Sequence, residues 1–230
     1  MQYQSIYGIL DIQRLMDLAR IAELLQPFTG ETQLSSSFLE QLQLYLDLLL
    51  KWNARINLTA VRDAEEIVTR HFGESVLAAT LLFPQGSGSR KITLADIGSG
   101  AGFPGLPIKL WAPEIELTLI ESQHKKATFL RELVRALKLD HVHVFAGRAE
   151  HWDQTADVVT LRAVEQFERA LPLAAALAQP TGKMCLLIGS RQMELARELT
   201  RSTWTFSAPV PIPLSSGRVI ALAEPISKSQ

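Results

Sequence analysis

A glycine-rich stretch constrains the fold of this chain more than any other feature. It reads Lys-Ile-Thr-Leu-Ala-Asp-Ile-Gly-Ser-Gly-Ala-Gly-Phe-Pro-Gly over residues 91–105. Ile92, Leu94 and Ile97 predict a short buried strand, and an apolar helical pattern follows from Leu106. The glycines between them allow a ligand to approach the backbone, because no side chain stands in the way. A strand, a glycine turn and a helix together predict the start of a nucleotide-binding α/β unit.

The glycine turn fits two classes of cofactor. Gly100, Gly102 and Gly105 match the G-x-G-x-x-G pattern of dinucleotide sites, which would predict an NAD-dependent oxidoreductase. In an earlier register, Asp96-x-Gly98-x-Gly100-x-Gly102 resembles motif I of the class I S-adenosylmethionine (SAM) methyltransferases. SAM carries no phosphate, and its methionine part needs close access to the backbone. We expect the Asp96 carboxylate to suit the ammonium group of that part.

Two prolines favour the SAM interpretation. Pro104 and Pro107 are tolerated only in the first turn of a helix, where a backbone N–H has no partner within the helix. They also remove N–H donors that a pyrophosphate would use at the start of a helix. The stretch therefore favours a methyltransferase over a dehydrogenase, and both over a glycine turn that binds no ligand.

Length and composition bound the class of protein. The 230 residues suffice for one sizeable core, or for a core with a small appended domain. Cys185 is the single cysteine, which excludes a disulfide within the chain. We expect a cytoplasmic protein, because no secretory signal and no apolar run of ~18 residues is present. With a net charge of −1, a nucleic acid partner would be held by a local basic patch rather than by bulk charge.

Residues 1–90 predict an N-terminal helical segment. An amphipathic pattern runs from Ile9 to Leu25, and Pro27 and Gly30 are expected to end it. A leucine-rich helix begins at Phe38, and a further helix spans Ala64 to Leu82. The stretch from Pro84 to Arg90 has the composition of a linker. We therefore expect a division into a helical segment, 1–90, and a cofactor-binding domain, 91–230.

The end of the leucine-rich helix carries two kinds of polar residue. We expect Asn53 and Asn57 to end the helix by satisfying backbone groups with their side-chain amides. Lys51 and Arg55 lie in the same stretch as these asparagines. They would begin a strip of basic side chains that faces RNA.

Strand and helix patterns alternate from residue 91 onward. Glu121 ends the second strand, where a carboxylate can accept hydrogen bonds from both hydroxyls of a ribose. Two successive strands at the carboxyl end, with no helix between them, favour the terminal hairpin of a methyltransferase sheet. No Cys-x-x-Cys or His-x-x-x-His pattern predicts a metal site. The expected strands span residues 92–97, 116–121, 142–145, 156–161, 184–188, 203–206 and 219–223.

Seven motifs carry a more specific resemblance. They are Lys51-Trp52-Asn53, Asn57-Leu58-Thr59, Arg70-His71, the stretch 96–107, Glu121-Ser122, Ala149-Glu150 and Arg162-Ala163-Val164. Together they resemble the bacterial 16S ribosomal RNA guanine-N7 methyltransferases, also known as glucose-inhibited division protein B, from about residue 38 to residue 224. The resemblance implies a class I SAM-dependent methyltransferase. Its fold would be a Rossmann-like α/β domain with a mostly parallel seven-stranded sheet, a terminal antiparallel hairpin and an N-terminal helical segment.

The resemblance also implies the target, the partner and the site residues. The target would be N7 of guanine 527 in the 530 loop of 16S rRNA, bound by a monomer that needs neither a metal nor a membrane. The expected SAM-binding residues are Asp96, Gly98, Gly100, Phe103, Glu121, Ser122, Ala149, Glu150 and Arg162. The expected RNA-binding residues are Lys51, Arg55, Arg70, His71, Lys125, Lys126 and Arg218. Two positions depart from the family pattern: Ile188 stands where a lysine is usual, and Val219 where a histidine is usual.

The expected chemistry needs no acid–base pair. Guanine N7 is a lone-pair acceptor with no proton to remove, so it can attack the methyl group directly. Arg162 is the candidate for positioning the guanine or a phosphate, and no other residue is assigned to catalysis. Two alternatives stay open at this point: an NAD-dependent oxidoreductase, and a non-catalytic module that binds rRNA or the ribosome.

Overall fold

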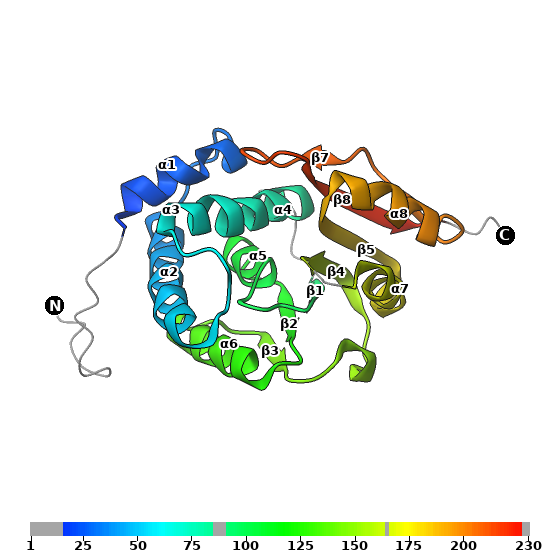
Figure 1. Ribbon diagram of the computed structural model, residues 1–230, viewed down its shortest axis with the longest axis horizontal. Helices are drawn as coiled ribbons and strands as arrows, with labels where there is room; N and C mark the ends of the chain where they lie inside the picture. Colours follow the sequence, from blue (N-terminus) through cyan, green and yellow to red (C-terminus); the bar gives the residue numbers. More distant parts are fainter. Residues whose placement is uncertain (1–15, 85–90, 164–165, 227–230) are drawn as a thin grey trace.

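The computed structural model describes residues 16–84, 91–163 and 166–226, which form an α/β fold around one mixed sheet (Figure 1). The helices are α1 (Leu18–Thr29), α2 (Ser36–Ile56), α3 (Ala64–Ile67), α4 (Glu74–Leu82), α5 (Gly105–Trp111), α6 (His124–Ala136), α7 (Phe167–Leu177) and α8 (Ser190–Thr200), with the π-helical turn η1 (Val68–Gly73) and the 3₁₀ turn η2 (Ala149–His151). The strands are β1 (Thr93–Ile97), β2 (Glu116–Ile120), β3 (Val142–Phe145), β4 (Ala156–Arg162), β5 (Ala178–Gly189), β6 (Trp204–Phe206), β7 (Val210–Pro211) and β8 (Arg218–Pro225).

The strand order places a crevice at the centre of the sheet. The order is β3-β2-β1-β4-β5-β8-β6, and β7 pairs with β8 outside this path. β1 to β5 pair in parallel, whereas β8 is antiparallel to β5, β6 and β7. The chain moves outward from β1 to β3 and then returns to β4 on the other side of β1. The carboxyl ends of β1 and β4 are therefore the switch point, where open α/β sheets bind ligands.

All seven expected strands are present, and an eighth was missed. β7 is only two residues long and includes a proline, so it gives no periodic pattern. β5 begins at Ala178 rather than at residue 184, because its first part contains Pro180 and Gly182, which mask the strand pattern. The register between β4 and β5 also shifts there.

Helix α1 differs from the expected helix of residues 9–25. It begins at Leu18, and Pro27 lies inside its last turn instead of ending it. The helix ends at Gly30, which has φ of +60° and donates its N–H to the Gln26 carbonyl at 3.0 Å. Residues 9–15 of the expected helix lie outside the described residues.

The helix expected over residues 64–82 contains a π-helical turn. Asp63 caps its start by accepting a hydrogen bond from the Glu66 N–H at 2.8 Å. The wider turn η1 then carries Arg70 and His71 before α4 begins. Such turns occur mostly at functional sites. At the end of η1, Gly73 lies against the ring of Phe28 in α1, so close that an added Cβ would stand 2.5 Å from it.

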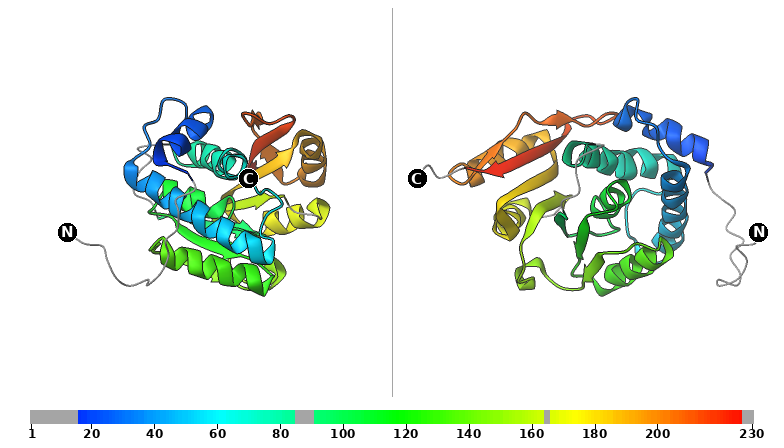
Figure 2. Two further views of the ribbon diagram at one scale, coloured as in Figure 1. Left: turned by 60° about the vertical axis from the view of Figure 1, so that its left-hand side comes forward. Right: turned by 180° about the vertical axis from the view of Figure 1, so that it is seen from behind.

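The core has two layers, one on each face of the sheet (Figures 1 and 2). Along β1 the side chains alternate: Leu94 packs with the N-terminal helices, α5 and α6, whereas Ala95 packs with α7 and α8. The N-terminal helices thus share one apolar core with the sheet. Cys185 in β5 is a fully buried core residue. Residues 85–90 lie outside the described residues, so the division at the linker stays a prediction.

Replacing Gly73 with alanine tests the packing of α1 against η1. The new methyl group would overlap the Phe28 ring. We expect the free energy of unfolding to fall by about 1 kcal/mol or more in urea titrations, although alanine favours a helix by roughly 1 kcal/mol over glycine. The control is Gly189→Ala, whose Cβ would find its nearest neighbour at 3.7 Å. Equal stability of the two variants would contradict this packing.

Candidate functional site

The glycine turn stands at the carboxyl end of β1 with an unusual backbone. Gly98, Gly100 and Gly102 all have positive φ, at +68°, +56° and +98°. Only glycine adopts such angles without strain, which explains the spacing in the sequence. Gly102 also lies under Tyr45 of α2, whose hydroxyl donates to the Ala101 carbonyl at 2.6 Å. Tyr45 therefore covers the side of the turn that faces α2, and the side that faces the switch point stays accessible to a ligand.

Asp96 supports the turn from inside the protein, which corrects our expectation for this residue. We expected its carboxylate to face an ammonium group, but Asp96 is fully buried. Its Oδ1 accepts from the Thr160 hydroxyl at 2.7 Å, and its Oδ2 accepts from the Gly105 N–H at 3.2 Å. Burial raises the pKa of the Asp96 carboxyl group to about 6, although the hydrogen bonds from Thr160 and Gly105 act in the opposite direction and lower it. Its observed contacts fix the turn to β4 and to the start of α5.

Glu121 holds the turn from the neighbouring strand β2. Its Oε2 accepts from the Gly100 N–H at 2.9 Å, and its Oε1 accepts from the Gln123 N–H at 2.7 Å. The side chain is almost fully buried. A carboxylate has more lone pairs than these two bonds use, so Glu121 can still accept from a ligand hydroxyl.

A cavity of about 310 Å³ opens beside Glu121. Gly98, Ser122, Ala149 and Glu150 line it, and all four were expected at the cofactor site. Sequence reasoning missed the far wall, which comes from α7 and the residues before it. This wall includes Gln166, Arg169 and Leu173, and no motif marked these positions.

A second cavity of about 300 Å³ lies on the other side of the turn, and Gly98 lines both cavities. Its walls come from distant parts of the chain: the loop 58–61, η1, the glycine turn, α6, β4 and β8. The predicted residues that line it are Gly98, Gly100, Phe103, Arg70, His71, Lys126, Arg162 and Arg218. The structure thus brings together cofactor candidates and RNA candidates in one cavity.

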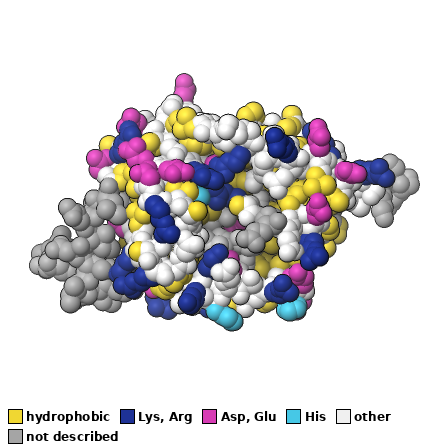
Figure 3. Space-filling model, viewed as in Figure 1, with side chains coloured by type: hydrophobic (Ala, Val, Ile, Leu, Met, Phe, Trp, Pro, Cys, Tyr) yellow, Lys and Arg dark blue, Asp and Glu magenta, His cyan; other side chains and the backbone are white. Residues whose placement is uncertain are grey.

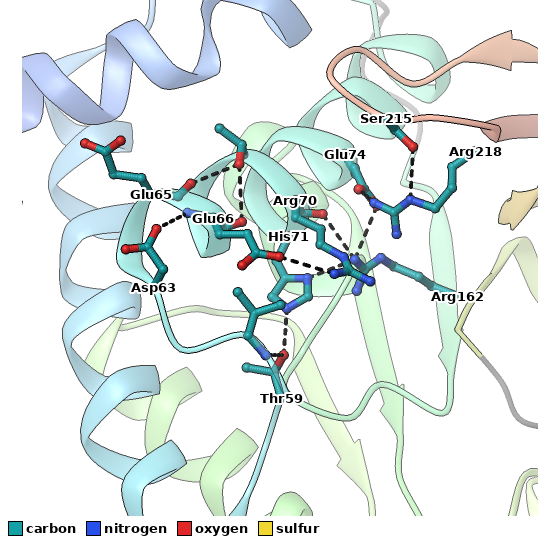
Figure 4. A network of polar contacts seen from close by, with 12 residues as sticks. Thr59, Asp63, Glu65, Glu66, Arg70, His71, Glu74, Arg162, Ser215 and Arg218 are labelled. Atoms are coloured by element: carbon teal, nitrogen blue, oxygen red, sulfur yellow. Dashed lines mark hydrogen bonds and ion pairs between the residues drawn. The ribbon is translucent and has the colours of Figure 1, made fainter.

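A buried carboxylate organises the arginines of this second cavity (Figure 4). Glu74, the first residue of α4, is only 2% exposed. Its Oε2 contacts Arg162 Nη2 at 3.2 Å, and its Oε1 forms an ion pair with Arg218 Nη2. Arg218 also donates from Nε to the Ser215 hydroxyl at 3.3 Å. Glu74 was not predicted, since an acid in a helix gives no sign of burial from sequence alone.

His71 is a neutral member of the same network. Arg162 Nη2 lies 2.9 Å from His71 Nδ1, and the Thr59 hydroxyl lies 2.8 Å from His71 Nε2. Because an arginine can only donate, Nδ1 accepts, and Nε2 carries the proton and donates to Thr59. Burial, together with the nearby positive charge of Arg162, lowers the pKa of His71 from 6.5 to about 2. His71 therefore carries no charge at neutral pH.

The lining of the second cavity is cationic. Arg70, Lys126, Arg162 and Arg218 line it, and none of the described lining residues is acidic. Lys and Arg side chains gather around a histidine at the centre of the face in Figure 3. Burial lowers the pKa of Arg162 to about 10, which still leaves it charged at neutral pH. Arg162 Nε has no hydrogen-bond partner among the described residues.

Three of the predicted RNA residues lie outside both cavities. Lys51 and Arg55 are exposed on α2, and Lys125 is exposed on α6. Figure 2 shows α2 alongside α6, and Trp52 donates to Glu132 across the two helices at 3.1 Å. These three exposed cations therefore lie on two neighbouring helices.

Of the two asparagines at the end of α2, Asn53 satisfies backbone groups as expected, whereas the Asn57 side chain accepts from Arg62 Nη2 at 2.7 Å. Asn53 accepts from the Thr59 N–H at 2.9 Å and donates to the Val61 carbonyl at 3.2 Å. Asn57 ends the helix in the left-handed conformation with φ of +51°. Together they shape the loop 58–61 that lines the second cavity.

The two departures from the family pattern lie opposite each other. Ile188 of β5 pairs with Val219 of β8, and both side chains are buried. They add to the apolar layer under α8. Neither position contributes to the cationic cavity. Within residues 16–84, 91–163 and 166–226, no helix could cross a membrane, and no cluster of His, Cys, Asp and Glu could hold a metal ion.

Comparisons with known proteins agree with this geometry. A family model described as rRNA small subunit methyltransferase G matches residues 38–212. A relative from Desulfitobacterium hafniense, ribosomal RNA small subunit methyltransferase G, is 35% identical over 91% of this chain and 81% of its own length. Two solved structures share the fold. The ribosomal protein L11 methylase from Lactobacillus delbrueckii has a TM-score of 0.54, 13% identity, and coverage of 67% of this chain and 77% of its own. TYW2 from M. jannaschii in complex with AdoMet has a TM-score of 0.53, 14% identity, and coverage of 67% of this chain and 74% of its own.

The protonation of His71 can be measured by NMR. The pKa of about 2 predicts that its ring signals do not titrate between pH 8 and pH 4, with the proton on Nε2. The unfolded chain binds a proton near pH 6.5 and the folded chain does not, so this site stabilises the fold above pH 6.5 and the contribution is lost as pH falls. The variant His71→Gln assigns the signal. A midpoint near pH 6.5 would contradict the network.

Proposed function

The chain belongs to the family of rRNA small subunit methyltransferase G, and we propose that it transfers the methyl group of SAM to N7 of a guanine in the 530 loop of 16S rRNA. The family methylates ribosomal RNA with SAM as the methyl donor. The identity of the base and of its atom is our proposal. Since the family and the relative are methyltransferases, neither the NAD-dependent oxidoreductase nor the non-catalytic module is retained.

The observation that carries the choice of N7 is that the cationic cavity offers no general base. None of its described lining residues is an acid, and its histidine is neutral with both ring nitrogens engaged. An exocyclic amine or a ribose hydroxyl would have to lose a proton during methylation, which a base normally accepts. Guanine N7 has no proton to lose. A cavity that only positions its substrate therefore suits N7 better than the other atoms.

The residues around the glycine turn fit SAM. The cavity with Ser122, Ala149 and Glu150 would take the adenine, and the Glu121 carboxylate beside it would accept from the ribose hydroxyls. The methionine part would pass Gly98, which lines both cavities and presents no side chain. SAM supplies a methyl group on a sulfonium, and the protein's own task is to place a nucleophile in line with it.

Arg162 is the residue that would orient the guanine. It lines the cavity, and its Nε–H has no partner among the described residues. Its Nη2 is fixed by Glu74, by His71 and by the Arg70 carbonyl. Guanine O6 is an acceptor next to N7. A bond from Nε to O6 would hold the base while leaving N7 free, and it would keep the arginine from neutralising the attacking lone pair.

The wider RNA contacts follow from the exposed cations. We place Lys51, Arg55 and Lys125 under the phosphate backbone of the small subunit RNA, outside the cavity that takes the target base. We also propose that the protein acts in the cytoplasm, where its small-subunit substrate would be, and that it acts as a monomer.

Mapping of the methylated base tests the proposal directly. Small subunits that lack the modification are incubated with labelled SAM and the purified protein, and the labelled nucleotide is then identified. We expect one label per subunit, on N7 of a guanine in the 530 loop. A label on another atom, on another loop or on protein would refute the assignment.

The substitution Arg162→Lys tests the positioning role. Lysine keeps the charge that Glu74 needs but lacks the planar fork and the Nε donor. We expect the transfer rate at saturating SAM to fall about 100-fold, because misplacement of the substrate has such an effect. SAM affinity measured by calorimetry should change less than about threefold. The exposed Arg201→Lys is the matched control. An unchanged rate in Arg162→Lys would show that Arg162 does not position the guanine.

A further inference from the structure

Two arginines of the site line another cavity as well. Arg70 and Arg218 belong to the cationic cavity beside Gly98, and both also line a cavity of about 380 Å³ between α1, η1 and the loop before β8. The two cavities therefore adjoin at these arginines. We name the cavity of about 380 Å³ the outer cavity. A ligand that occupied both cavities would have to pass over Arg70 and Arg218.

The positive charge of the site favours the binding of an anion close to Arg70 and Arg218. Four cationic side chains line the cavity beside Gly98, and the sulfonium of SAM adds a further positive charge there. Arg218 is half-buried; burial lowers its pKa, and repulsion from the nearby charge of Arg70 lowers it further. A phosphodiester between Arg70 and Arg218 would offset this repulsion. A nucleoside without a phosphate carries no charge and would not offset the repulsion between Arg70 and Arg218.

The outer cavity has a different chemistry, which suits a neutral base. Phe28, Pro213 and Leu214 give it apolar walls, and the Thr69, Ser215 and Ser216 hydroxyls lie among them. Its two acids are matched by arginines, because Glu66 pairs with Arg70 at 3.3 Å and Glu74 is shared by Arg162 and Arg218. A nucleic-acid base has flat apolar faces and polar edges. It therefore matches the apolar walls and the hydroxyl groups of this cavity.

Leu214 marks the rim of the outer cavity. It is 75% exposed, the highest value among the exposed large hydrophobic residues of the described chain, and its backbone has φ of +57°. A leucine gains nothing from full exposure in water. Its side chain would be covered if a base lay against it. Figure 4 shows the Ser215 hydroxyl directed at Arg218, whose guanidinium in turn points toward Glu74.

We propose that Arg70 and Arg218 bind the phosphodiester that joins the target guanosine to an adjacent nucleotide, and that the outer cavity takes the base of that nucleotide. The inference rests on the proposed function, because it assumes that the guanine occupies the cavity beside Gly98. It adds a second base-binding subsite and makes the enzyme specific for a guanosine within a strand.

The test measures binding of RNA to the full chain by fluorescence anisotropy at low salt. The probes are single-stranded 530-loop RNAs in which the nucleotide on the 5′ or the 3′ side of the target guanosine is abasic. A second pair carries a neutral methylphosphonate at one of the two flanking linkages. We expect the wild-type protein to lose about tenfold in affinity with the abasic residue on one side. The methylphosphonate on that same side should give a comparable loss, and changes on the other side should have a smaller effect.

A cavity-filling variant supplies the second arm. Ser216 is exposed and lines the outer cavity, so Ser216→Trp should fill it without disturbing the core. We expect this variant to bind intact RNA about tenfold more weakly and to lose nothing further with the abasic RNA. The control is Ser202→Trp, an exposed serine that lines a cavity away from these arginines. It should bind all RNAs as the wild type does.

The outcomes separate this inference from the proposed function. Equal binding of intact and abasic RNA by the wild-type protein overturns the inference, and so does the absence of any binding of the loop RNA. An abasic penalty that Ser216→Trp retains in full overturns it as well. If the binding pattern is as expected but the mapped methyl group is not on guanine N7, the proposed function fails and the second subsite stands.

Discussion

The buried carboxylate of Glu74 is the constraint on which the site depends. It joins Arg162 at the end of β4 to Arg218 at the start of β8, and it comes from α4, so three elements meet at one charge. Removing one partner from a buried ion pair leaves an uncompensated charge at a cost of about 3–5 kcal/mol. The arginines in turn carry a net positive charge that a single carboxylate does not cancel. The ion pairs of Glu74 therefore hold the site together. The site nevertheless keeps a net positive charge, which an anion would neutralise.

The neutral state of His71 follows from the same constraint. A charged side chain at this position would face Arg162 at 2.9 Å and would add to the repulsion among Arg70, Arg162 and Arg218. A neutral imidazole instead accepts from Arg162 and donates to Thr59, which ties the loop 58–61 to the arginine. The uncharged His71 ring thus lies between Arg162 and Thr59 and is hydrogen-bonded to both. The π-helical turn η1 allows this, because it presents Arg70 and His71 to the cavity just before α4 supplies Glu74.

The sequence predicted those parts of the site that depend on local geometry. Gly98, Gly100 and Gly102 were predictable because each needs a positive φ, and Glu121 because it ends a strand beside them. The parts that depend on contacts between distant residues were not predictable. Glu74 looks like any helical acid until β4 and β8 deliver arginines to it. The π-helical turn carries no composition signal, and β7 is too short to show a period.

Asp96 shows how a correct motif can yield a wrong orientation. The alternation of β1 places Ala95 and Ile97 in the layer under α7 and α8, so Asp96 must point to the opposite face. That face is covered by the N-terminal helices and α5, and the carboxylate ends against Thr160 and the Gly105 N–H. The sequence contained the alternation, but only the packed structure shows that the opposite face is closed.

The N-terminal helices contribute one side of the cavity that we propose takes the target base. A sheet of this topology recurs in methyltransferases with unrelated substrates, so the sheet alone does not select a target. Here the loop 58–61 and η1 form one side of the cationic cavity. Tyr45 of α2 stacks on Phe103 with ring centroids 5.2 Å apart, which fixes the helices to the glycine turn. Phe103, which this stacking fixes, also lines the cavity in which the guanine is proposed to lie, so the packing of the N-terminal segment would affect the proposed target site directly.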